Sequence, residues 1–179
     1  MSNAQTKYSL LSKSFHWVSA IAVIFLFALG YWMVELTYYS SWYKTAPHIH
    51  KSIGILLFIV TVLRLIYKVK QPSVEPISTH SSTIKLISKL THIGLYLLMI
   101  VIMFSGYLIS TADDRGIEVF NLFTVPSMGE LFPNQEDTAG LIHEYLAYTI
   151  IGLVVLHAAG ALKHHFIDKD DTLKRMLNK

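Results

Sequence analysis

The chain has 179 residues, a length typical of a single domain, and 53% of them are hydrophobic whereas only 15% are charged. With a mean hydropathy of +0.44 it is too apolar for an ordinary water-soluble domain, and the absence of cysteine excludes disulfides and thiolate metal sites. The formal net charge of +3 comes from lysines and arginines that flank the apolar segments, so it indicates membrane topology and no nucleic-acid partner.

Four apolar segments, at 15–34, 50–67, 90–110 and 142–162, each approach the ~20 residues that a helix needs to cross a hydrocarbon layer. The first has no small-residue cleavage site and carries Trp32 and Met33 near its end, which favours a retained span over a signal peptide. The sequence therefore predicts one all-α domain over residues 1–179, an integral membrane four-helix bundle in the lipid bilayer.

The distribution of basic residues predicts the orientation of the bundle. Twelve of the fifteen lysines and arginines lie in the N-terminal segment, the 64–89 connection and the C-terminal tail, so both termini are expected in the cytoplasm. The two outer connections hold eight acidic residues and three basic ones, which are Lys44, Lys51 and Arg115.

The outer loop 111–141 is the longest connection. Its portion at 117–132, IEVFNLFTVPSMGELF, is apolar enough to predict a short helix lying on the surface as a lid. The inner connection contains QPSVEPISTHSS and reads as an irregular loop, in which His80 receives no functional role.

Two histidines mark the ends of the fourth apolar segment. The fourteen steps from His143 to His157 give a helical rise of about 21 Å and a rotation of about 1400°, some 40° short of four turns, so both imidazoles point to one side. Depth along the other segments places His50 at the outer level of His143. The same reasoning places His16 at the inner level of His157.

Two neutral imidazoles facing each other across a bundle are what a six-coordinate b-type haem requires. A single membrane histidine is more often a packing group that makes a hydrogen bond, but four histidines at two matching depths favour two haem b groups with irons about 20 Å apart. His48 competes with His50, which fits better because it starts the apolar run. Four glycines lie within the apolar segments: Gly54, Gly94, Gly106 and Gly152. They either leave room for the haem macrocycle or allow two helices to cross closely, and the sequence favours neither interpretation.

Other polar residues also lie near the inner level. Arg64 follows His50 by fourteen residues and either pairs with haem propionates or anchors the helix in the headgroup region. His92, His164 and His165 either supply hydrogen bonds and protons to a quinone or are solvated at the interface.

Several stretches resemble the bacterial cytochrome b561 family of di-haem four-helix membrane proteins, and within it the superoxide oxidase type. They are SFHW (14–17), HKSIGILLFIVTVLRL (50–65), HIGLYLL (92–98), and the segment from IHEYLAY to LHAAGALKHHF (142–166), followed by DTLKRM. The His-Glu pair and the LHAA…HH segment are the most specific of these. The outer loop 111–141 matches poorly.

The resemblance implies that His16 and His157 ligate an inner haem and that His50 and His143 ligate an outer one. It also implies His164 as a quinone-site residue. The superoxide oxidase type passes electrons from superoxide to ubiquinone, so the resemblance implies transfer from superoxide at the periplasmic side to ubiquinone near the cytoplasmic side of the bacterial inner membrane. The expected activity is therefore that of a superoxide:ubiquinone oxidoreductase.

Two alternatives remain at this stage. In the first, the chain is a di-haem electron conduit between the quinone pool and a periplasmic redox partner, without superoxide activity. In the second, it is a haem-free transporter of metal ions or protons that is lined by histidines. The near absence of intramembrane carboxylates argues against the transporter. The acidic outer segments repel an anionic donor, unless Lys44, Lys51 and Arg115 form a local basic patch.

Overall fold

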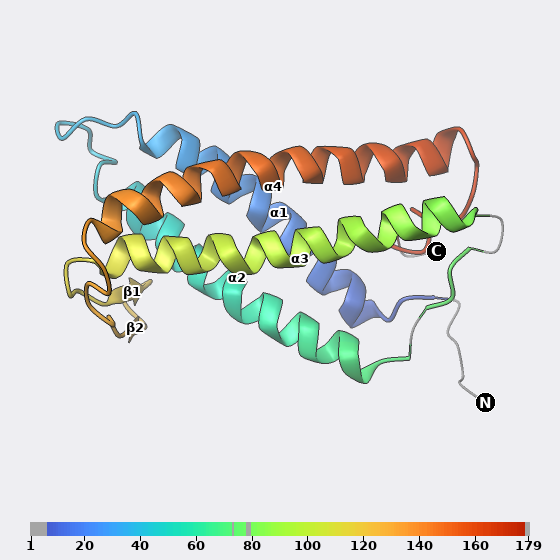
Figure 1. The fold of residues 1–179 in the computed structure, drawn as a ribbon, viewed down its shortest axis with the longest axis horizontal. Helices are drawn as coiled ribbons and strands as arrows, with labels where there is room; N and C mark the ends of the chain where they lie inside the picture. Colours follow the sequence, from blue (N-terminus) through green and yellow to red (C-terminus); the bar gives the residue numbers. More distant parts are fainter. Residues whose placement is uncertain (1–6, 73, 78–79, 178–179) are drawn as a thin grey trace.

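The computed structural model describes residues 7–177 except 73, 78 and 79. Its four long helices are α1 (Leu10–Met33), α2 (Thr45–Lys70), α3 (Ser82–Thr111) and α4 (Gln135–Phe166). Each is long and apolar enough to cross a membrane. In the bundle α3 packs along α4, α1 along α2, and α2 against α3 (Figure 1). The prediction of four membrane-spanning helices is confirmed.

The helices extend into the polar sequence that flanks the apolar segments. Ser9 caps α1 by accepting a hydrogen bond from the Ser12 N–H, and Ser81 caps α3 in the same way. Helix α2 begins at Thr45, so Pro47 lies in its first turn, where proline leaves no helical hydrogen bond unmade. His48 therefore belongs to the helix and not to the preceding turn.

An apolar layer fills the middle of the bundle. Leu57, Met99 and Ile150 are buried there and pack against further aliphatic side chains of α1, α3 and α4. Ile150 lies seven residues from both His143 and His157. The layer thus separates the two ends of the bundle, each of which carries its own histidines.

Large apolar side chains also cover the outer faces of the helices. Val155 and Leu156 are 61% and 69% exposed, and Ile21 and Leu97 are similarly exposed. Such a surface is unfavourable in water but matches hydrocarbon, in which a helix satisfies its backbone groups internally. The protein is a multi-pass membrane protein.

A two-stranded antiparallel hairpin, β1 (Ile117–Val119) and β2 (Phe123–Val125), lies in the connection between α3 and α4. The predicted surface helix at 117–132 is therefore wrong. The strands are joined by a turn in which Phe120 and Asn121 have φ of 47° and 58°, and the Leu122 N–H donates to the Val119 carbonyl. Alternating β-branched residues suit such a pleated, half-buried ribbon.

The hairpin is fixed to α2 by Ser52, which is fully buried. Its hydroxyl donates to the Glu118 carbonyl over 3.3 Å and accepts from the Phe120 N–H over 3.1 Å. The ring of Phe120 also lies against that of His48. We call this end of the bundle, with residues 34–44 and 112–134, the hairpin end.

The opposite end, here called the tail end, consists of the α2–α3 loop and residues 168–177. The tail folds back across α1, where Lys13 Nζ donates to the Leu177 carbonyl and Trp17 Nε1 to the Met176 carbonyl. The start of α1 and the tail thus lie at one end of the bundle (Figure 1), which agrees with the prediction that both termini lie on one side of the membrane; that this side is the cytoplasm stays a prediction. The first six and last two residues, which that prediction also covers, lie outside the described residues.

Candidate functional site

The structure brings the four predicted histidines together as two opposed pairs. At the hairpin end, the ring centres of His50 from α2 and His143 from α4 are 6.2 Å apart, with an interplanar angle of 67°. At the tail end, His16 from α1 and His157 from α4 show the same separation and the same angle. Helix α4 therefore supplies one imidazole to each pair.

The spacing of each pair matches a metal ion held between two ring nitrogens. A metal–imidazole bond of ~2.0 Å on each side, with the distance from nitrogen to ring centre added, puts ring centres about 6.3 Å apart. The observed 6.2 Å agrees. The pairs thus fit an axial bis-histidine set; their role as ligands stays a prediction.

Contacts from α3 set the tautomer of His143. Its Nδ1 lies 3.0 Å from the Ile102 carbonyl and 3.0 Å from the Ser105 hydroxyl. Because a carbonyl only accepts, Nδ1 carries the hydrogen and Nε2 keeps its lone pair, which is the arrangement that metal-binding histidines need. The Nδ1 of His50 is buried and has no hydrogen-bond partner among the described residues.

Glycines back the hairpin-end imidazoles. A Cβ added at Gly30 would lie 3.1 Å from Cε1 of His50, and one at Gly106 would lie 3.1 Å from Cε1 of His143. Both helices therefore approach the rings more closely than a residue with a Cβ would ordinarily tolerate. Elsewhere, an added Cβ would meet no atom within 4 Å at two of the glycines considered as space for a macrocycle, Gly54 and Gly152.

Two cations of α2 lie beside the tail-end pair. Arg64 Nη2 is 3.2 Å from Nδ1 of His16, and the side chains of Arg64 and Lys68 both lie over the ring of Tyr96. Neither cation forms a salt bridge with a carboxylate among the described residues. A partly buried arginine in a membrane helix calls for an anionic partner, and the predicted pairing of Arg64 with haem propionates stays a prediction. Sequence reasoning found Arg64 but missed Lys68, which follows it by one helical turn.

His92 also lies at the tail-end pair, but in a different relation to it. Its ring centre is 5.2 Å from that of His157, too close for a metal between facing nitrogens, so the two rings touch edge to face. Its Nδ1 is 2.7 Å from the Ser88 carbonyl, to which it donates. The Nε2 of His92 is therefore left to accept a hydrogen bond.

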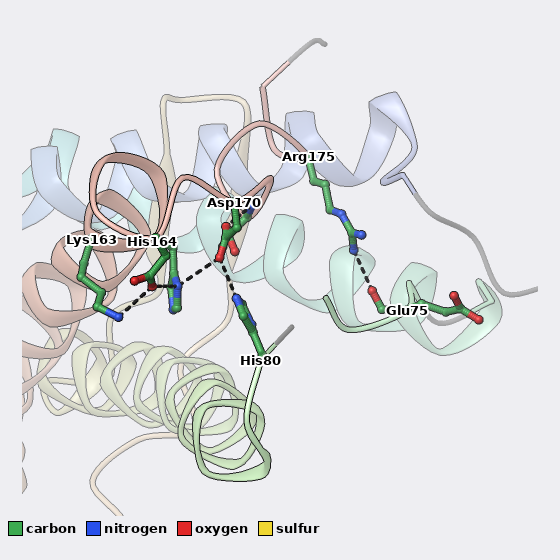
Figure 2. Close-up of polar contacts among 8 residues, drawn as sticks. Glu75, His80, Lys163, His164, Asp170 and Arg175 are labelled. Carbon is green, nitrogen blue, oxygen red and sulfur yellow. Dashed lines mark hydrogen bonds and ion pairs between the residues drawn. The ribbon is translucent and has the colours of Figure 1, made fainter. Parts of the chain in front are cut away.

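His164 belongs to a separate polar cluster at the tail end (Figure 2). Its Nδ1 lies 2.7 Å from Asp168 Oδ2 and 3.2 Å from Asp170 Oδ2, and its ring stacks on that of His80. The structure thus surrounds His164 and His92, the two predicted quinone residues, with different neighbours. His80, which the sequence left without a role, is held at 2.7 Å by Asp170.

Asp170 is ionised at neutral pH. Partial burial opposes its ionisation, but hydrogen bonds from Thr172 and His80 outweigh that effect and lower its pKa to about 2. Asp168 behaves similarly, because its hydrogen bond from Lys163 lowers the pKa of its carboxyl group.

At the hairpin end, one of the three outer basic residues is already paired. Arg115 forms an ion pair and hydrogen bonds with Asp113, which leaves little free positive charge at that position. Lys44 and Lys51 form no salt bridge among the described residues. Any basic patch for an anionic donor therefore depends on these two lysines.

A four-helix membrane bundle that carries two opposed histidine pairs defines the class of membrane-bound b-type cytochromes. The chain belongs to the prokaryotic cytochrome b561 family, whose family model matches residues 7–179. Members of this family bind b-type haem and transfer electrons across the membrane.

Individual relatives agree with this assignment. The chain is 50% identical over 177 residues to cytochrome b561 homolog 2 of Escherichia coli K12, covering 99% of this chain and 94% of that protein. It is 29% identical to the probable superoxide oxidase CybB of Yersinia pestis, over 97% of both chains. It is 30% identical to cytochrome b561 homolog 1 of Escherichia coli K12, over 90% of this chain and 92% of that one.

Proposed function

We propose that the protein is a superoxide oxidase of the bacterial inner membrane, which takes electrons from superoxide at the periplasmic side and gives them to ubiquinone near the cytoplasmic side. Two superoxide ions, one ubiquinone and two protons become two molecules of O₂ and one ubiquinol. The observation that carries the proposal is the pair of opposed histidine sets at the two ends of one membrane bundle. The similarity to the probable superoxide oxidase CybB supports the choice of donor.

The four paired histidines would hold two haem b groups, His50 with His143 and His16 with His157. When bound, each haem supplies a centre that accepts and releases one electron. The chain's own contribution is to orient the ligands. Ser105, with the Ile102 carbonyl, keeps the proton of His143 on Nδ1.

Positive charge beside the tail-end pair would raise the reduction potential of a haem bound there, which favours electron transfer toward that end of the bundle. Arg64 and Lys68 compensate the propionates of the haem that His16 and His157 would hold, and they stabilise its reduced state relative to its oxidised state. Because Tyr96 lies against both cations, their side chains are held in place without a carboxylate.

The reduction of a quinone also needs protons at the cytoplasmic side. His92 offers a free Nε2 beside His157, and the half-buried ring of His164 lies in the tail-end cluster that opens toward the cytoplasm. We assign the hydrogen bond to the quinone oxygen to one of these imidazoles and the relay of protons to the other. An imidazole has two ring nitrogens, so it can donate a hydrogen bond through one and accept or pass on a proton through the other, which suits both roles.

The hairpin end would face the periplasm, where superoxide arrives. This orientation follows from the basic residues of the tail end, among them Lys13, Lys174 and Arg175. On the proposed periplasmic side, Lys51 lies one residue after His50, and Lys44 immediately precedes the first residue of the same helix. These two lysines would attract the anion against the surrounding acidic residues.

A second candidate function is that of an electron conduit between the quinone pool and a partner redox protein, without superoxide activity. One observation favours it specifically: the relative with 50% identity is named a cytochrome b561 homolog and not a superoxide oxidase.

The two candidates are separated by mixing the purified, oxidised protein with a superoxide generator and catalase while the visible spectrum is recorded. The proposal predicts that reduced b-haem bands rise at once and that superoxide dismutase suppresses them. Bands that appear only with dithionite or quinol would reject superoxide as the donor and leave the conduit.

A further inference from the structure

Two histidines and an aspartate meet at the tail end (Figure 2), where His164 lies seven residues beyond His157 on α4. His80 Nε2 lies 2.7 Å from Asp170 Oδ2, and His164 Nδ1 lies 3.2 Å from the same oxygen. One donor atom from each of the three residues lies within 4.8 Å of the other two. The residues come from the α2–α3 loop, from α4 and from the tail.

We propose that His80, His164 and Asp170 form a binding site for one divalent transition-metal ion, with Zn²⁺ as the best match. Two imidazole nitrogens and one carboxylate oxygen are a donor set that Zn²⁺ binds well, whereas Mg²⁺ and Ca²⁺ prefer oxygen ligands alone. The inference goes beyond the proposed function and shares one residue with it, His164, whose Nδ1 faces the metal site and whose Nε2 stays free to donate a hydrogen bond to a quinone oxygen.

The separations within the cluster are close to those of a metal site. Ligand atoms at ~2.0–2.1 Å from a tetrahedral Zn²⁺ lie about 3.3 Å from one another, so the observed 2.7 and 3.2 Å require shifts of less than about 1 Å. The side chains are 15%, 15% and 11% exposed, which leaves a route for the ion while most water is excluded.

The state of His164 points to a ligand and not only to a hydrogen-bond network. Its buried Nδ1 has two carboxylates in range, but among the described residues it makes no hydrogen bond of acceptable geometry. A buried imidazole nitrogen without a partner is costly, and coordination removes that cost. Asp168 lies 2.7 Å from this nitrogen and is held by Lys163, so a water molecule or Asp168 can complete a fourth position.

The charge of the cluster also suits a dication. Asp168 and Asp170 bring two negative charges, and Lys163 is the only cation that pairs with either of them among the described residues. A bound metal would join three chain segments that are otherwise linked here by few bonds, such as the one from Arg175 to the Glu75 carbonyl. Binding to the folded state alone would therefore raise the melting temperature.

The test uses the full-length, haem-loaded protein, purified in detergent without a histidine tag and stripped of metal with EDTA. ZnSO₄ is added in equilibrium dialysis, and bound zinc is counted by mass spectrometry in the presence of excess Mg²⁺. We expect one Zn²⁺ per chain, and a Zn²⁺ affinity at least tenfold weaker in His80→Ala and in Asp170→Asn. Zinc should raise the melting temperature of the wild type but not of either variant.

His48→Ala is the matched control, since it removes a histidine from the hairpin end and should leave zinc binding unchanged. The visible haem spectrum of each variant verifies that it is folded. Equal zinc affinity in wild type, His80→Ala and Asp170→Asn, or no stoichiometric zinc in the wild type, would overturn the proposal. Neither result would bear on superoxide or quinone chemistry, because neither compound is present in the dialysis.

Discussion

Replacing Arg64 by methionine should lower the midpoint potential of the tail-end haem and leave that of the hairpin-end haem nearly unchanged. The guanidinium Nη2 lies 3.2 Å from Nδ1 of His16. If Nε2 of His16 binds the iron, Nδ1 carries the hydrogen and no longer accepts from Arg64, but a guanidinium that stays beside the ring still places its positive charge about 7 Å from the iron. Removing this charge favours the oxidised haem, so the potential falls.

The magnitude follows from Coulomb's law. At about 7 Å and an effective dielectric constant of ~20, a unit charge contributes about 2 kcal/mol, which corresponds to about 100 mV for a one-electron couple. The hairpin-end pair lies about 21 Å from Arg64 along the helix, where the same charge contributes about a third as much before screening by salt lowers it further.

The assay is a redox titration of the reduced-haem absorbance in the purified protein. Arg64→Lys is the matched control, because it keeps the charge while it removes the planar guanidinium. A His50→Ala variant, which should retain only the tail-end haem, assigns the two midpoints. If Arg64→Met shifts neither midpoint more than Arg64→Lys does, or shifts mainly the hairpin-end haem, the reasoning about this charge is wrong.

Three further predictions concern other parts of the bundle. Ser52→Ala removes both hydrogen bonds that hold the hairpin and leaves the Phe120 N–H unpaired, so unfolding should become easier by about 1–3 kcal/mol, measured as a lower melting temperature. Lys51→Glu should slow the reduction of the protein by superoxide, and more so at low ionic strength, measured by stopped-flow absorbance. His164→Gln should slow ubiquinone reduction at least tenfold without loss of haem, measured as quinol formation after chemical reduction of the protein.

Each of these predictions has a contrary result. An unchanged melting temperature for Ser52→Ala, with Ser40→Ala as a control at an exposed turn, would mean that the hairpin is held by other contacts. A Lys51→Glu rate equal to that of wild type at all salt concentrations would show that Lys51 does not attract the donor. Normal quinone reduction by His164→Gln would mean that His164 does not contact the quinone and that the quinone binds beside His92.

The helices were predictable from sequence because their signals are local. Runs of about 20 apolar residues specify spans, and a helical rise of 1.5 Å per residue specifies which side chains share a level. Hence the pairs that depth predicts, such as His16 with His157, are the pairs whose rings lie 6.2 Å apart. Arg64 was placed at the tail-end level by the same periodicity.

The hairpin was missed because its turn lacks the usual signal. An Asn-Gly or Asp-Gly pair would have marked it, but Phe120 and Asn121 take the positive φ angles, and phenylalanine is uncommon there. The tail-end cluster was missed for another reason. His80 and Asp170 are 90 residues apart, and nothing in the sequence near either residue indicates that the tail folds back to join them.

The central claim is that the two histidine pairs each hold one haem b, and haem stoichiometry tests it most directly. Haem per chain is measured by pyridine haemochrome and protein assays in wild type, His143→Ala and His157→Ala, with His48→Ala as the control. The account predicts two haems in wild type and in His48→Ala, and one in each of the other variants. A wild type with one haem or none, or two haems retained in either ligand variant, would contradict it.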